Sequence, residues 1–136
     1  MAVKVLLMLA AYTGQARYEE PAQRALVALQ PAMTQYPAAF AQWLGALEFA
    51  LAPPQEVAVM GQPDAADVQA MLHVLLEPYR PNQVVAAVAP DRIVGHPALV
   101  ETRPMQEGRA TAYVCQRFTC QRPVTTAAAL KGLLES

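Results

Sequence analysis

The adjacent prolines Pro53 and Pro54 divide this sequence into two parts with different hydrophobic spacing. Before them, apolar residues recur at three- and four-residue steps, which is the spacing of one face of an α-helix. After them, short apolar runs are separated by one helical stretch and by turn-rich segments. Two successive prolines remove two backbone donors, so they end the helical part. The sequence predicts a helical part over residues 1–52 and an α/β part over 55–136.

Three helices are expected in the first part. The first is apolar from Val3 to Ala11 and stops near Gly14, a residue suited to the left-handed conformation past a helix end. Pro21 is expected in the first turn of the second helix, and Pro31 is expected to kink or break that helix near residue 30. A third helix is expected to begin at Pro37 and to end at the double proline.

The second part predicts a βαβ unit. Apolar runs from Glu56 to Met60 and from Gln83 to Ala89 have the length and composition of strands. Between them Asp64 is expected to cap a helix, with Asp67 near its positive end. Strands joined in this way are parallel with a right-handed crossover. The continuous apolar character of the second strand predicts that it is covered on both faces.

A loop, a third strand and a last helix complete the prediction. Prolines and glycines over residues 90–109 favour a loop, with one helical turn around 98–101. The third strand is expected from Thr111 to Cys115, and Thr125 or Thr126 is expected to cap the final short helix. The predicted fold class is therefore α/β (α+β). A helical hairpin of about three helices precedes a small three-stranded sheet, and the single domain spans 1–136.

Composition excludes several classes of partner. Of 136 residues 15% are charged, against roughly a quarter in typical soluble domains, and the formal net charge is −1. Without a basic cluster we expect no binding to nucleic acid or to an anionic membrane surface. The first apolar run is about half the ~20 residues that cross a bilayer. Because Lys4 alone makes a meagre basic start for a signal peptide, we expect a cytoplasmic, thiol-reducing location.

Several segments together resemble a known family. They are 56–61 (Glu-Val-Ala-Val-Met-Gly), 81–85 (Pro-Asn-Gln-Val-Val), 110–115 (Ala-Thr-Ala-Tyr-Val-Cys) and 118–120 (Phe-Thr-Cys), and before them 12–14 (Tyr-Thr-Gly). In this order they are similar to the C-terminal part of the YyaL or spermatogenesis-associated thioredoxin-like proteins. Arg117 departs from the family's pattern, in which asparagine is expected before the aromatic residue.

The resemblance implies a part of a larger protein. Family members carry an N-terminal thioredoxin-like domain and an α/α barrel similar to sugar epimerases and six-hairpin glycosidases, and both are absent from this sequence. The chain then resembles a truncated C-terminal fragment that acts as a structural cap or oligomerisation module rather than as an enzyme by itself. Because its helices are apolar around much of their circumference, we also expect a homodimer or larger homo-oligomer.

The candidate functional residues are Tyr113, Cys115, Phe118 and Cys120. The two cysteines have the spacing C-x4-C, whereas thioredoxin-type redox centres have C-x-x-C. The favoured interpretation is therefore two separate thiols, with Cys115 ending a buried strand and Cys120 packed behind the turn. A local disulfide, a redox pair and a small thiol- or metal-binding protein remain the alternatives.

No cofactor or metal site is expected. His73 and His96 would complete a set of four zinc ligands with the two cysteines, but they lie in a helix and a distant loop without paired spacing. Gly61 follows a strand, where α/β folds often bind ligands, yet no glycine-rich phosphate motif surrounds it. No catalytic residue and no small-molecule ligand can be named from the sequence.

Overall fold

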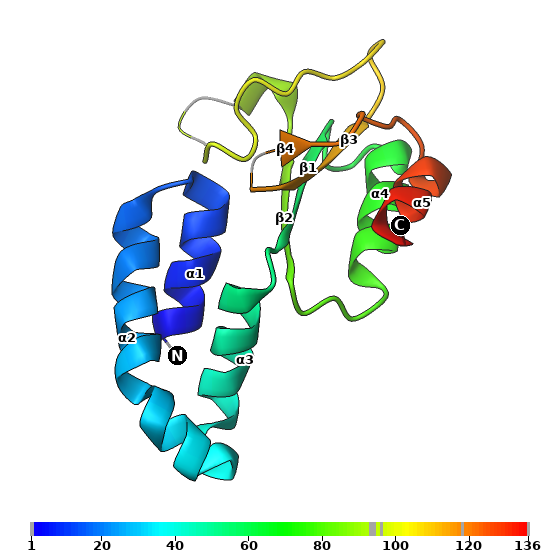
Figure 1. Ribbon diagram of the computed structural model, residues 1–136. Helices are drawn as coiled ribbons and strands as arrows, with labels where there is room; N and C mark the ends of the chain where they lie inside the picture. The colour runs from blue at the N-terminus through cyan, green and yellow to red at the C-terminus, as the bar shows by residue number, and fades with distance from the viewer. Residues whose placement is uncertain (1, 93–94, 96, 118, 136) are drawn as a thin grey trace.

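A computed structural model describes residues 2–92, 95, 97–117 and 119–135. The described elements form three layers, with α1–α3 on one face of a sheet and α4 and α5 on the other (Figure 1). Their bounds are α1 Ala2–Thr13, α2 Ala16–Gln35, η1 Pro37–Phe40, α3 Ala41–Leu51, β1 Gln55–Met60, α4 Ala66–Leu76, β2 Gln83–Val88, η2 Pro90–Arg92, β3 Thr111–Gln116, β4 Thr119–Cys120 and α5 Ala127–Glu135. The expected α/β class and the helix–sheet order are confirmed.

The sheet has four strands in the order β2-β1-β3-β4. β1 and β2 are parallel in register from Gln55↔Gln83 to Met60↔Val88, which confirms the βαβ unit. β3 runs antiparallel to β1. The expectation of three strands is wrong, because β4 has only two residues and such a length shows no apolar alternation in a sequence. β2 is covered less completely than expected, since Val85 is half-buried and Ala87 is exposed, whereas Val57 to Met60 of β1 are all fully buried.

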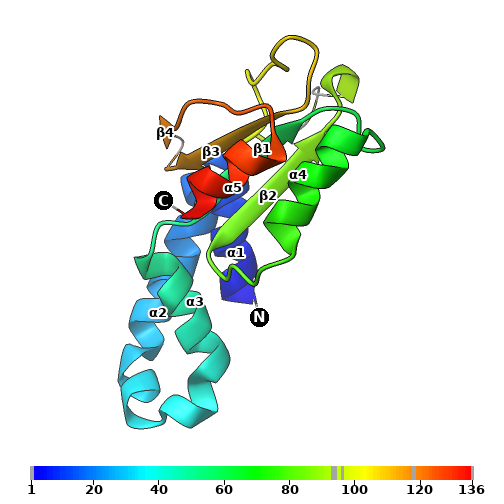
Figure 2. The ribbon, with the colours of Figure 1, turned by 90° about the vertical axis from the view of Figure 1, so that its right-hand side faces the viewer.

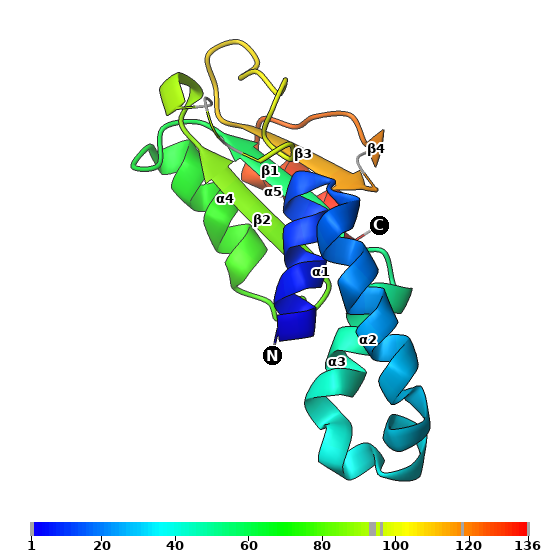
Figure 3. The same ribbon diagram turned by 90° about the vertical axis from the view of Figure 1, so that its left-hand side faces the viewer.

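Each face of the sheet has its own apolar core, since successive strand residues point to opposite faces. Ala58, Met60 and Val84 face α1–α3 together with Leu99 and Val100 of the 90–109 loop. Figure 3 shows α1 in front of the sheet, with α2 beside α1 and α3 farther from the strands. The second core faces α4 and α5, which cover the sheet in Figure 2, and comprises Val57, Val59, Ala112 and Val114 with Val68, Met71, Leu75 and Leu130.

The second helix differs from its prediction. α2 is continuous through both Pro21 and Pro31, and it begins a turn earlier than expected. Pro31 therefore does not break the helix. A proline leaves the carbonyl four residues earlier without its helical partner, and here that residue, Val27, is exposed to water. Gly14 takes the expected left-handed conformation, with φ of 67°.

The caps also differ in part. Thr126 caps α5 as expected, since its Oγ1 accepts the amide of Ala129 at 3.2 Å. Asp64 is not the cap of α4, because Ala65 occupies that position without a side-chain hydrogen bond. Asp67 instead accepts the amide of Val68 at 2.9 Å.

The α2–α3 hairpin extends past α1 and past the sheet (Figure 3). Its far end, formed by η1, therefore packs neither against α1 nor against the sheet. At that end Tyr36 is 58% exposed and Leu44 is 36% exposed. Among the described residues, no helix combines the length and the apolar character needed to cross a membrane.

Candidate functional site

Cys115 and Cys120 form a disulfide in the structure. They are direct partners in the antiparallel pairing of β3 and β4, and their Cα atoms lie 3.9 Å apart. The interpretation as two separate thiols is therefore wrong, and the local disulfide that stood as an alternative is present. Sequence spacing missed it because a tight hairpin places residues five apart opposite each other. Cys115 is buried as expected, whereas Cys120 is exposed.

The hairpin turns within two residues, between Gln116 and Thr119. Arg117 opens this turn with φ of 49°, in the left-handed region that suits glycine and asparagine. Asparagine, which the resemblance led us to expect here, adopts this region more readily than arginine does. Phe118, the aromatic candidate, lies outside the described residues.

The guanidinium of Arg103 lies against both sulfur atoms. Its Nη2 is 3.3 Å from Sγ of Cys120 and 3.6 Å from Sγ of Cys115. Its Nη1 donates to the carbonyl oxygens of Ala98, at 3.1 Å, and Leu99. The loop thus fixes the guanidinium by backbone contacts, with one edge directed at the disulfide.

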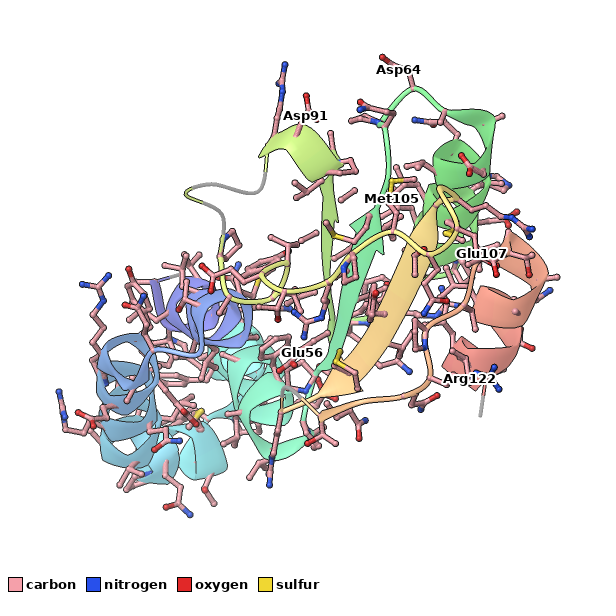
Figure 4. The ribbon with its side chains drawn as sticks, turned by 90° about the horizontal axis from the view of Figure 1, so that it is seen from above. Glu56, Asp64, Asp91, Met105, Glu107 and Arg122 are labelled. Carbon is pink, nitrogen blue, oxygen red and sulfur yellow. A yellow bond between two sulfur atoms is a disulfide. The ribbon has the colours of Figure 1, made fainter. Side chains whose placement is uncertain are left out.

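Glu56 adds a buried negative charge to the same face of the sheet. It is 3% exposed and lies opposite Cys115 in the pairing of β1 with β3. Figure 4 shows Glu56 at the boundary between the helical layer and the sheet. Burial lowers the pKa of Arg103, and the neighbouring charge of Glu56 raises that pKa, so the carboxylate favours the charged guanidinium. We call Glu56, Arg103, Cys115 and Cys120 the sulfur–arginine cluster.

Tyr113 lies two residues before Cys115 on the same face of β3. Its hydroxyl donates to the carbonyl oxygen of Pro104 at 2.7 Å, directly after Arg103 in the chain. Burial raises the pKa of Tyr113, and the charge of Arg103 opposes this rise. Tyr113 therefore anchors the loop that carries Arg103.

A cavity of about 340 Å³ opens beside the cluster, between α1, α3 and the start of β1. Apolar residues, among them Leu7, Ala11 and Phe49, line most of it. Glu19, Glu56 and Arg117 also line it. The cavity thus offers an apolar wall, two carboxylates and one arginine next to the β3–β4 hairpin.

The histidines do not join the cysteines in the described part of the chain. His73 is a helix-flank residue, with Nε2 3.5 Å from a carboxylate oxygen of Glu77. His96 lies outside the described residues. Within residues 2–92, 95, 97–117 and 119–135, no three His, Cys, Asp or Glu side chains group as metal ligands. Gly61 is a packing position, since a Cβ there would lie 2.5 Å from Cγ2 of Val68.

Sequence reasoning missed Arg103 altogether. It stands in a loop whose composition indicates only turns, and its partners are 12 and 17 residues away. The one available signal was its charge in a chain with few charged residues. Glu56 carried a comparable signal, as an acidic residue at the start of an otherwise apolar strand.

Comparison with known proteins gives a distant relationship. Spermatogenesis-associated protein 20 of Homo sapiens is 26% identical over 132 residues, that of Mus musculus 27% over 133 and that of Rattus norvegicus 28% over 133. Each alignment covers 95% of this chain but 17% of the relative. No family model matches the sequence, and no solved structure matches the fold. The chain thus spans about a sixth of the curated proteins that it resembles, and the likeness supports a distant relationship to the spermatogenesis-associated protein 20 family, as part of a larger protein.

Proposed function

We propose that this chain is a packing module, without sugar-directed catalysis of its own, whose helical layer docks on a second apolar helical surface. The observation that carries the proposal is the exposure of large apolar side chains on all three helices of that layer. Val5 of α1 is 55% exposed, Val27 of α2 is 71% exposed and Leu51 of α3 is 75% exposed. Full burial of such a side chain contributes about 1.5–3 kcal/mol, so covering several of them favours association.

The distribution of charge supports the same proposal. Lys4 is the one charged residue among the twelve of α1. The free end of the α2–α3 hairpin adds Tyr36 and Leu44, which are exposed, and Trp43, which is half-buried. Apolar surface of this kind on a soluble fold is typical of an interface.

We take the docking surface to be a second copy of this chain. Its net charge of −1 gives little electrostatic repulsion between copies, and near-neutral proteins associate more readily than strongly charged ones. A stable dimer of this kind buries at least about 1,000 Å² in total. The proposal is therefore a homodimer formed through α1–α3.

In a longer protein the same module would close one end of a helical domain. We infer that α1–α3 correspond to the last helices of an epimerase- or glycosidase-like helical domain and that 55–136 form its C-terminal tail. A thioredoxin-like domain would belong to another part of such a protein. We place the protein in the cytoplasm, in keeping with the weak signal-peptide character of its first residues.

Light scattering coupled to size-exclusion chromatography tests the proposal over a range of concentrations. We expect twice the chain mass for the wild type and a shift to the monomer for Val27→Glu, which places a charge in the interface. Leu76→Glu is the matched control, because Leu76 is 69% exposed on α4, in the opposite layer, and should leave the dimer intact. A monodisperse wild-type monomer at all concentrations would refute the homodimer. Turnover of a sugar by the isolated chain would refute the absence of catalysis.

A further inference from the structure

Arg103 is unusual in directing a charged guanidinium at a neutral disulfide. Nη2 approaches the two sulfur atoms at 3.3 and 3.6 Å. Disulfide sulfur is a weak acceptor, so this contact stabilises the oxidised form only slightly. A thiolate at either position would gain a charge-assisted contact with the same group, and nearby arginine is one of the features that lower a thiol pKa. The arrangement therefore favours the reduced, anionic state more than the oxidised one.

The two sulfur atoms differ in access. Cys115 is 1% exposed, whereas Cys120 is an exposed residue of β4. This difference in residue exposure favours attack by an external thiolate at Cys120 over attack at Cys115. In thiol–disulfide exchange the sulfur that is not attacked becomes the leaving group, and exchange is faster when that group is stabilised as a thiolate.

We propose that Cys115–Cys120 is a redox-active disulfide, reduced by a dithiol through attack on Cys120, and that Arg103 stabilises the leaving thiolate of Cys115. One thiolate of the dithiol attacks Sγ of Cys120 and forms a mixed disulfide, while the Cys115–Cys120 bond breaks and its electron pair stays on Cys115. The second thiol of the reductant loses its proton and attacks the reductant's first sulfur, which is bonded to Sγ of Cys120 in the mixed disulfide. This attack releases Cys120 as a thiolate, which takes a proton from water. The dithiol leaves as a disulfide, and two electrons have passed to the chain.

Two further contacts fit this role. Glu56 lies opposite Cys115 in the β1–β3 pairing and favours the charged form of Arg103. Its own negative charge disfavours a thiolate at Cys115, so the positive charge of Arg103 is needed to offset it. Ala98 and Leu99 hold Nη1 through their carbonyl oxygens, so the guanidinium is in position before the bond breaks. In a thiol-reducing compartment disulfides are rare and those present are mostly catalytic or redox-sensing. The inference does not depend on dimer formation by the helical layer.

Equilibration of the intact chain with mixtures of oxidised and reduced dithiothreitol, followed by alkylation and mass measurement, tests the role of Arg103. Arg103→Met should shift the equilibrium about tenfold toward the disulfide, which corresponds to about 30 mV for a two-electron couple. Arg103→Lys should retain most of the wild-type potential, because it keeps the charge. Arg92→Met, an exposed position on η2, is the control and should be unchanged. Equal potentials for wild type and a folded Arg103→Met chain would overturn the assignment, as would a wild-type disulfide that excess dithiothreitol leaves intact.

A trapping experiment tests the site of attack without altering Arg103. With an aromatic disulfide reagent, Cys115→Ser should rapidly form a mixed disulfide at Cys120, whereas Cys120→Ser should react at Cys115 at least about tenfold more slowly, because that sulfur is buried. Circular dichroism of both variants is the check that they are folded. Equal rates in two folded variants would refute attack at Cys120.

Discussion

Asp67 in the first turn of α4 joins two elements that are distant in the sequence. Its Oδ2 accepts the backbone amide of Ala110, 43 residues later, at 3.0 Å, while Oδ1 accepts the amide of Val68 at 2.9 Å. The carboxylate therefore links α4 to the start of β3, in addition to its favourable place near the positive end of the helix.

This contact predicts a loss of stability in acid. The hydrogen bond from Ala110 lowers the pKa of Asp67 below its ordinary value of 3.8. A lowered folded-state pKa means that the stabilisation is complete above the unfolded-state pKa and is lost as the pH falls through the folded-state value. Asp67→Asn should therefore be less stable than wild type in urea near pH 6, and the difference should narrow toward about pH 3. Asp64→Asn, in the exposed turn before α4, is the control and should show no such pH-dependent difference from wild type. A difference in unfolding free energy between wild type and Asp67→Asn that is constant with pH would contradict the prediction.

Any side chain at position 61 should destabilise the fold through steric overlap. An added Cβ would lie 2.5 Å from Cγ2 of Val68 and 3.4 Å from the backbone of Ala110. Val68 is buried and β-branched, so it cannot move aside freely. Gly61→Ala should lower the free energy of unfolding by about 1–3 kcal/mol. Gly45→Ala is the matched control, because a Cβ there meets nothing within 4 Å and alanine favours a helix by about 1 kcal/mol. Both are measured by urea denaturation.

Replacement of Arg117 by asparagine or glycine should stabilise the folded chain. Its φ of 49° is unfavourable for a long side chain, whereas asparagine and glycine adopt this region readily. Arg117→Asn and Arg117→Gly should each raise the free energy of unfolding, by about 1 kcal/mol for the better of the two. Thermal unfolding of the oxidised chain measures this. Gln121→Asn, an exposed position beyond the hairpin, is the control. A decrease in stability for both Arg117 variants would show that the arginine side chain makes a compensating contact.

Removal of the Tyr113 hydroxyl should cause a modest loss of stability. It donates to the carbonyl oxygen of Pro104 at 2.7 Å, and removing such a bond costs about 0.5–1.5 kcal/mol. Tyr113→Phe should lower the unfolding free energy by this amount. Protease sensitivity at residues 97–105 should increase as well, because the loop loses an anchor. Tyr79→Phe, at a position 88% exposed, should change neither quantity. Unchanged protease sensitivity in Tyr113→Phe would refute the anchoring role.

Much of the fold follows from local patterns. The stop at Gly14, the parallel strands 55–60 and 83–88 and the cap at Thr126 all depend on periodicity or on a single residue's conformational preference. The failures have local causes too. Pro31 stays inside α2 because the interrupted hydrogen bond faces water, and β4 is too short to show a pattern.

The site was predictable only in part. Tyr113 and Cys115 were identified on a strand, and the structure places them on one face of β3, but Cys120 was expected to pack as a thiol and instead closes a disulfide. Arg103 and Glu56 complete the cluster through contacts that no spacing rule contains. They come from a loop and from a neighbouring strand, and the sheet's register brings Glu56 opposite Cys115.

By itself the sequence determined the order and type of the five α-helices and of β1 to β3, the division at Pro53 and Pro54 and the apolar character of the helical layer. These depend on interactions between residues a few positions apart, so local spacing is sufficient to predict them. Only the tertiary structure decided that Cys115 pairs with Cys120 and that Arg103 and Glu56 meet beside them. Pairing across strands and contact with a loop depend on register and chain path, and those are set by the packing of the whole sheet between its two helical layers.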